Sequence, residues 1–108
     1  MNIRKIKAGD GGPNQEFVVS ASLFMENLKN VLVVGLDSDG TDGPTRFAGA
    51  IADEEFVSRA RPAGIDLFDS LKRHDVTPAL VKLGDVIQTG ATGTNVNDLK
   101  FLVIYPHQ

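Results

Sequence analysis

The feature that most constrains this chain is an unbroken apolar run, VLVVGL, at residues 31–36. A half-exposed strand alternates apolar and polar residues, whereas a short run that is apolar throughout is typical of a strand covered on both faces. Parallel sheets with helices on either side contain such strands. We therefore predict that residues 31–36 form the central strand of a sheet that lies between helices, which places the chain in the α/β class.

The segments around this strand alternate between strand and helix patterns, and no linker or repeat divides them. Strands are predicted at residues 2–7 and 99–106, with a short one before residue 89. Helices are predicted over residues 14–30, 44–52, 53–64, 65–75 and 77–84. Their inward stripes are expected at Phe17, Ser20, Ala21, Phe24 and Leu28, and at Ile65, Phe68 and Leu71, and all six phenylalanines are expected in the core. The sequence thus predicts one α/β domain over residues 1–108, with a mixed sheet covered by helices.

Composition excludes several classes of function. The chain has 108 residues, a net charge of -3 and no cysteine, and its histidines are His74 and His107. Without a basic surplus it lacks the charge of a nucleic-acid-binding protein. No apolar stretch is long enough to cross a membrane and no signal segment begins the sequence, so we expect a cytoplasmic protein without a membrane partner. Thiolate and histidine-rich metal sites are excluded, which leaves oxygen ligands.

Three aspartates follow the central strand in the sequence DSDGTDG at residues 37–43. The pattern matches haloacid-dehalogenase-type phosphatases, in which Asp37 would attack phosphorus and Asp39 would act as acid and base. That family needs a further carboxylate where Thr89 stands here. A helix-loop-helix calcium site is excluded, because Asp42 and Ala48 occupy positions that need glycine and glutamate. A simple Asp- and Gly-rich turn remains open as an alternative.

Two other loops are rich in glycine: TGATGTNVND at residues 89–98, and AGDGGPNQE at residues 8–16, which begins a predicted helix. Backbone N–H groups in such loops and at helix N-termini attract anions. Loops that follow strands in α/β sheets gather at one edge, so these three segments are expected to meet there. Carboxylates, amides and hydroxyls together suit phosphoryl transfer, although a strong cation is missing.

The residues that carry a family resemblance are, in order along the chain, "GDGGPNQEF", "DGTDGPTRFAGA" and "GDVIQTGATGTNVNDL", and the resemblance covers nearly all of residues 8–104. Together they resemble the C-terminal MOFRL domain of class II glycerate 2-kinases, some of which are called hydroxypyruvate reductases. The resemblance implies phosphorylation of D-glycerate to 2-phosphoglycerate with ATP and Mg²⁺. It also implies a Rossmann-like kinase domain that this chain lacks, with the active site in the cleft between the two.

In the glycerate 2-kinase interpretation, Asp39 and Asp42 are the catalytic residues and orient Mg²⁺ or the glycerate hydroxyls. Substrate or phosphate contacts are expected at Gly11, Gly12, Asn14, Thr41, Thr92, Thr94, Asn95 and Asn97. Pro13 replaces the family's arginine, and Ala91 replaces a proline. We therefore expect the chain to be inactive alone and to need a separate or missing kinase domain. The alternative is a non-catalytic module that binds a metabolite or another subunit, and its apolar face could instead be buried in a homodimer.

Overall fold

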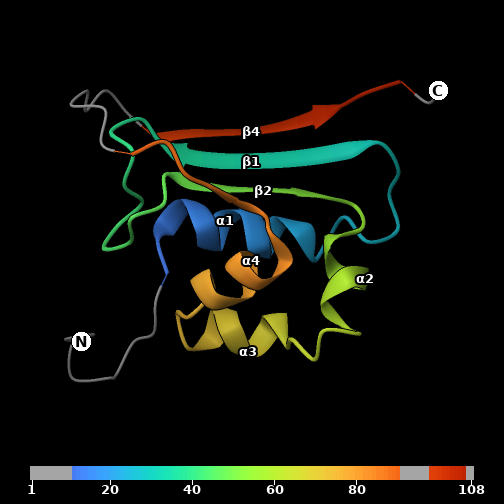
Figure 1. Cartoon of the computed structure of the whole chain (residues 1–108). Helices are drawn as coiled ribbons and strands as arrows, with labels where there is room; N and C mark the ends of the chain where they lie inside the picture. The colour runs from blue at the N-terminus through green and yellow to red at the C-terminus, as the bar shows by residue number, and fades with distance from the viewer. Residues whose placement is uncertain (1–10, 91–97, 107–108) are drawn as a thin grey trace.

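The computed structural model describes residues 11–90 and 98–106, which form a four-stranded sheet with helices packed against it (Figure 1). The predicted strand at residues 2–7 lies outside the described residues. The helices are α1 (Pro13–Ser22), α2 (Phe56–Ala60), α3 (Leu67–Lys72) and α4 (Thr77–Leu83), and the strands are β1 (Val31–Asp37), β2 (Gly49–Asp53), β3 (Val86–Ile87) and β4 (Asp98–Ile104).

The sheet has the order β3-β2-β1-β4. The prediction of a central strand at residues 31–36 is confirmed, as are the sheet-and-helix class and the strands near residues 87 and 99–106. The sheet was predicted to be mixed, but among the described strands every pair is antiparallel: β1 pairs with β2 and β4, and β2 pairs with β3. An unbroken apolar run reports that a strand is buried, and it carries no information on the direction of the neighbouring strands.

Helix α1 packs on β1 and β2 through a face different from the predicted one. Its buried side chains are those of Asn14, Gln15, Val18, Val19 and Ser22. Phe17 and Phe24 are exposed, and the helix ends at Ser22 rather than near Lys29. The hydrophobic pattern fails here because the inward polar residues have hydrogen-bond partners from distant loops, which periodicity cannot show.

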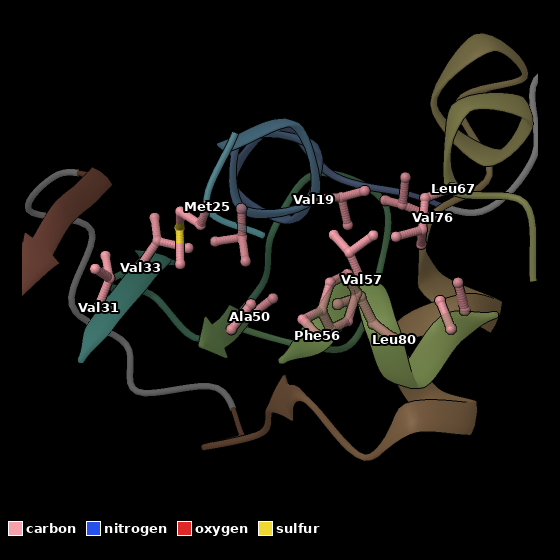
Figure 2. Close-up of a cluster of buried hydrophobic side chains, with 14 residues drawn as sticks. Val19, Met25, Val31, Val33, Ala50, Phe56, Val57, Leu67, Val76 and Leu80 are labelled. Atoms are coloured by element: carbon pink, nitrogen blue, oxygen red, sulfur yellow. The ribbon is translucent and has the colours of Figure 1, made fainter. Parts of the chain in front are cut away.

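The apolar core lies where α1 and β1 meet α2, α3 and α4 (Figure 2). Val33, Phe56 and Leu80 are fully buried in this core. The prediction that all six phenylalanines are core residues is wrong, because only Phe47 and Phe56 are buried. In α3 the buried apolar residue is Leu67, whereas the predicted Phe68 is exposed.

Residues 44–52 were expected to form a helix, but they form a turn followed by β2. Small residues explain the strand: a Cβ placed on Gly49 would lie 1.9 Å from the carbonyl oxygen of Gly35 in β1. The close approach of β1 and β2 therefore requires glycine at position 49. The helices predicted over 53–64, 65–75 and 77–84 are confirmed in shorter form as α2, α3 and α4.

Helices α2, α3 and α4 lie away from β4, which forms the edge of the sheet (Figure 1). Every residue of β4 is exposed. Within residues 11–90 and 98–106, no helix is long and apolar enough to cross a membrane.

Candidate functional site

The Asp-rich loop after β1 lies between the start of α1 and the segment after β3. A Cβ on Gly40 would meet the carbonyl oxygen of Gly90 at 2.1 Å, and one on Gly43 would lie 3.1 Å from Cδ of Pro13. The expected meeting of loops at one end of the sheet is therefore confirmed for the described residues, at the left of Figure 1. Thr92, Thr94, Asn95 and Asn97 lie outside the described residues.

Asp42 is fully buried at the N-terminus of α1. Its carboxylate accepts the backbone N–H of Asn14 at 2.9 Å and that of Gln15 at 2.7 Å. The side-chain amide of Asn14 donates to the same carboxylate at 3.1 Å. An anion at a helix N-terminus is favoured by the free N–H groups and the helix dipole, and here the chain supplies that anion itself. This geometry favours a positioning role for Asp42 over the direct ligand contact that the sequence predicts.

Gly12 is the residue that makes room for Asp42. It caps α1 in an extended conformation, and a Cβ at this position would lie 2.3 Å from the carbonyl oxygen of Asp42 and 2.4 Å from its carboxylate. Pro13 begins the helix, and the N–H of Glu16 donates to the carbonyl oxygen of Gly12 at 2.9 Å. The N–H groups of Asn14, Gln15 and Glu16 are thus all engaged within the chain. The predicted anion cradle at the start of α1 is consequently filled by Asp42.

A polar network that the sequence analysis missed extends from this point to α4. Gln15 Nε2 donates to Thr45 Oγ1 at 2.8 Å, and Thr77 Oγ1 donates to Gln15 Oε1 at 2.5 Å. The Thr45 hydroxyl also lies 2.8 Å from the carbonyl oxygen of Asp42. Buried polar groups that are paired in this way specify one arrangement of the elements they join. Gln15 therefore fixes the Asp-rich loop and α4 against α1.

Asp39 is half-buried, and its carboxylate accepts bonds from Thr41 N at 2.8 Å and Thr41 Oγ1 at 2.9 Å. These bonds, first that of the backbone N–H, hold the pKa of Asp39 below its ordinary value. The carboxylate is therefore ionised at neutral pH and lies near the surface, as a ligand for a cation must be. Of the two predicted catalytic aspartates, Asp39 fits such contact better than Asp42.

Asp37 lies directly opposite Asp98 on the β1–β4 ladder. Asp37 Oδ1 accepts the backbone N–H of Asp39 at 3.1 Å, and this bond by itself acts to lower the pKa of Asp37. Partial burial and the carboxylates of Asp39 and Asp98 outweigh that bond, so the pKa of Asp37 is raised above its ordinary value. The side-chain amide of Asn14 and then Lys100 lower the pKa of Asp98. Sequence spacing could not find this pair, because it depends on the strand register.

His74 lies just beyond the end of α3 and contacts α1. Its Nδ1 lies 3.1 Å from the carboxylate of Glu16 in α1. Over residues 11–90 and 98–106, no group of three or more His, Cys, Asp or Glu side chains is arranged to hold a metal ion.

The model of the MOFRL family matches residues 1–98 of the chain. The chain belongs to the MOFRL family. A glycerate 2-kinase from Pyrococcus horikoshii is 45% identical to this MOFRL chain over 98 residues, which cover 91% of the chain and 22% of the relative. A D-glycerate 2-kinase from Thermotoga maritima is 44% identical over 91 residues, again 22% of its length.

The fold of this MOFRL domain matches solved crystal structures. A crystal structure of glycerate kinase from Thermotoga maritima superposes with a TM-score of 0.87 at 42% identity, and the match covers 93% of this chain and 24% of that one. The chain therefore spans about a quarter or less of the relatives it matches. This family membership replaces the phosphatase alternative, in which Asp37 was the nucleophile.

Proposed function

We propose that this MOFRL domain forms half of the active-site cleft of a glycerate 2-kinase and is inactive without a kinase domain. The observation that carries the proposal is the 45% identity to a glycerate 2-kinase over 98 residues, in a match that covers only 22% of that enzyme. The reaction would transfer a phosphoryl group from ATP to D-glycerate, with Mg²⁺. Phosphoryl transfer depends on positioning and charge neutralisation, which loops from two domains can share.

The residues of this chain would divide the work between contact and positioning. Asp39, with Thr41 beside it, would face the ligand at the surface of the Asp-rich loop. Asp42, Asn14 and Gly12 would hold that loop on α1, since all three are buried there. Gly11 and the loop that contains Thr92, Thr94, Asn95 and Asn97 would line the same end of the sheet. ATP and most of the cation charge would come with the kinase domain.

The surface of β4 supports a role with a further domain. Phe101, Leu102 and Ile104 on this edge strand are 46%, 54% and 74% exposed. Leu99, Val103 and Tyr105 are also exposed. A long apolar edge strand promotes association, and in a complete enzyme it would be covered. We assign this surface to the kinase domain, with self-association into a homodimer as the competing outcome.

A complementation assay tests the proposal. The chain would be mixed with Thermotoga maritima glycerate kinase from which the segment matching this chain has been removed, and D-glycerate phosphorylation would be followed with ATP and Mg²⁺. We expect turnover by the mixture and none by either part alone. Ordinary turnover by the chain alone would contradict the claim that it is inactive without a partner, and a silent mixture that nevertheless associates would contradict the half-site.

A second candidate is favoured by one observation. Asp42 occupies the N–H groups of Asn14 and Gln15 at the start of α1, and the resemblance to class II glycerate 2-kinases implies that Pro13 replaces an arginine there. The chain could therefore be a non-catalytic module that binds a metabolite or a subunit. A Pro13→Arg variant separates the two candidates: it should raise the turnover of the complemented kinase, whereas a non-catalytic module gains no activity from it.

A further inference from the structure

Two carboxylates and one side-chain amide gather under the start of α1. Asp37 and Asp98 are direct partners on the β1–β4 ladder, and directly opposed residues project to the same face of a sheet. Gly35 shares that face with Asp37, because side chains alternate along a strand, and a Cβ on Gly35 would lie 2.9 Å from the carbonyl oxygen of Asn14. Both carboxylates are therefore on the face that α1 covers.

The negative charge of this pair is only partly balanced. Lys100 Nζ lies 3.4 Å from the carboxylate of Asp98, in a pair that is partly exposed. No Lys, Arg or His forms an ion pair with Asp37 within residues 11–90 and 98–106. Like charges directly opposite one another on adjacent strands are destabilising.

Asn14 supplies an independent observation. Its side chain is 1% exposed, and its Oδ1 atom is buried without a hydrogen-bond partner. The Nδ2 end of the same amide donates to Asp42 and also to Asp98. Exchanging the two ends of the amide would not help, because both carboxylates require a donor. A buried acceptor without a partner is destabilising, so Oδ1 needs a donor or a cation that the described residues do not provide.

We propose that Asp37, Asp98 and Asn14 Oδ1 bind a divalent cation of the Mg²⁺ class at the end of β1. Carboxylate and amide oxygens are the ligands that Mg²⁺ and Ca²⁺ prefer, and Mg²⁺ is commonly held by one or two carboxylates while water or phosphate oxygens complete its shell. The ion would relieve the repulsion between the carboxylates and give Asn14 Oδ1 its partner. The site differs from the predicted Asp39 and Asp42 pair, because Asp42 already serves the N-terminus of α1.

The presence of the ion does not depend on the proposed kinase function, although its use in binding nucleotide phosphate does. The test therefore uses the metal alone, without ATP, glycerate or a second domain. Purified chain would be titrated with Mn²⁺ while free Mn²⁺ is followed by electron paramagnetic resonance, and Mg²⁺ would then be added as a competitor. We expect saturable binding of a single ion per chain that Mg²⁺ displaces.

The matched variants are Asp37→Asn and Asp98→Asn, with Asp69→Asn as the control. Asp69 is an exposed carboxylate in α3 that pairs with Arg73, so its variant loses the same charge at a different place. We expect Mn²⁺ affinity to fall about tenfold or more in the first two variants and to stay unchanged in the control. Circular dichroism would confirm that each variant is folded. If Asp37→Asn does not fold, Asp98→Asn still tests the site.

Two results would overturn the site. One is the absence of Mn²⁺ binding by the unmodified chain at millimolar concentration, and the other is equal binding by all folded variants. A failed complementation assay with intact Mn²⁺ binding would reject the kinase half-site but keep the metal site. Turnover in the complementation assay by a chain that binds no Mn²⁺ would reject the metal site but keep the kinase half-site.

Discussion

The carboxylate of Asp42 accepts the backbone N–H of Gln15 at 2.7 Å, across 27 positions of the sequence. Gly12, the residue that caps α1, offers no side chain for this purpose, so an aspartate from a distant loop stabilises the helix start. The same contact holds the Asp-rich loop at the end of the sheet. The stability of α1 and the position of the candidate site therefore depend on one carboxylate.

Replacement of Asp42 should destabilise the fold before it affects any ligand. Asp42→Ala leaves the N–H groups of Asn14 and Gln15 buried and unpaired, and we expect it to lower the free energy of unfolding by about 3 kcal/mol. Asp42→Asn keeps one acceptor oxygen and should cost less. Urea unfolding followed by circular dichroism measures both. Loss of ligand binding with unchanged stability in either variant would instead support the direct role predicted from the sequence.

Gly12→Ala should disturb the same contact from the opposite side. Its Cβ would lie 2.3 Å from the carbonyl oxygen of Asp42, a distance that forces the loop to move. Overpacking of this kind costs about 1–3 kcal/mol. Gly64→Ala is the control, because nothing lies within 4 Å of that position and its cost comes only from a φ of +75°. A smaller loss of stability in Gly12→Ala than in Gly64→Ala would refute the packing argument.

The sequence predicted the positions of the helices and strands more reliably than which of their residues are buried. The apolar run at β1, the acidic start of the segment that contains α2, and the dense apolar residues of β4 mark their elements locally. The inward face of α1 could not be predicted, because Asn14 and Gln15 are buried only where Asp42, Thr45 and Thr77 meet them. Hydrophobic patterns assign such polar residues to the surface.

For the candidate site, the sequence likewise predicted which segments take part but not how their side chains are arranged. Three motifs identified the loops, and the structure confirms that the described parts of those loops converge. The division between Asp39 at the surface and Asp42 in the interior depends on hydrogen bonds that spacing does not reveal. The pairing of Asp37 with Asp98 depends on the register of an antiparallel ladder, whereas the sequence had suggested parallel strands.

Gln15 should couple the two threonines that it joins. Thr45→Val and Thr77→Val each remove one hydroxyl partner of Gln15, and each should lower the free energy of unfolding by about 1–2 kcal/mol. Because both bonds use one side chain, the double variant should lose a different amount from the sum of the single losses. A double-mutant cycle by urea unfolding measures this difference. Strict additivity would show that the two bonds act independently.

The pKa values of the aspartates near the end of β1 should be shifted in opposite directions by folding. The pKa of Asp37 is raised above 3.8, so between 3.8 and its folded value the folded chain binds the proton more tightly, and the contribution of Asp37 to the free energy of unfolding falls as the pH rises. The pKa values of Asp39 and Asp98 are lowered, so their contribution is present above 3.8 and is lost as the pH falls through their folded values. NMR titration of the carboxyl carbons without divalent metal should show Asp37 above the other two. Asp37→Asn should remove the fall in the free energy of unfolding that Asp37 contributes as the pH rises. A pKa of Asp37 below those of Asp39 and Asp98 would contradict the cross-strand repulsion.

The edge strand β4 should determine how the chain associates. Phe101 and Ile104 are exposed apolar residues on this strand, so Phe101→Lys and Ile104→Lys should weaken the contact with the kinase domain while leaving the isolated fold intact. Val81→Lys on α4 is the control, because Val81 is 48% exposed but lies on a different element. Sedimentation of the mixed domains would give the affinity, and sedimentation of the chain alone would show whether it dimerises. A β4 variant that loses dimers but keeps its affinity for the kinase domain would assign this strand to self-association instead.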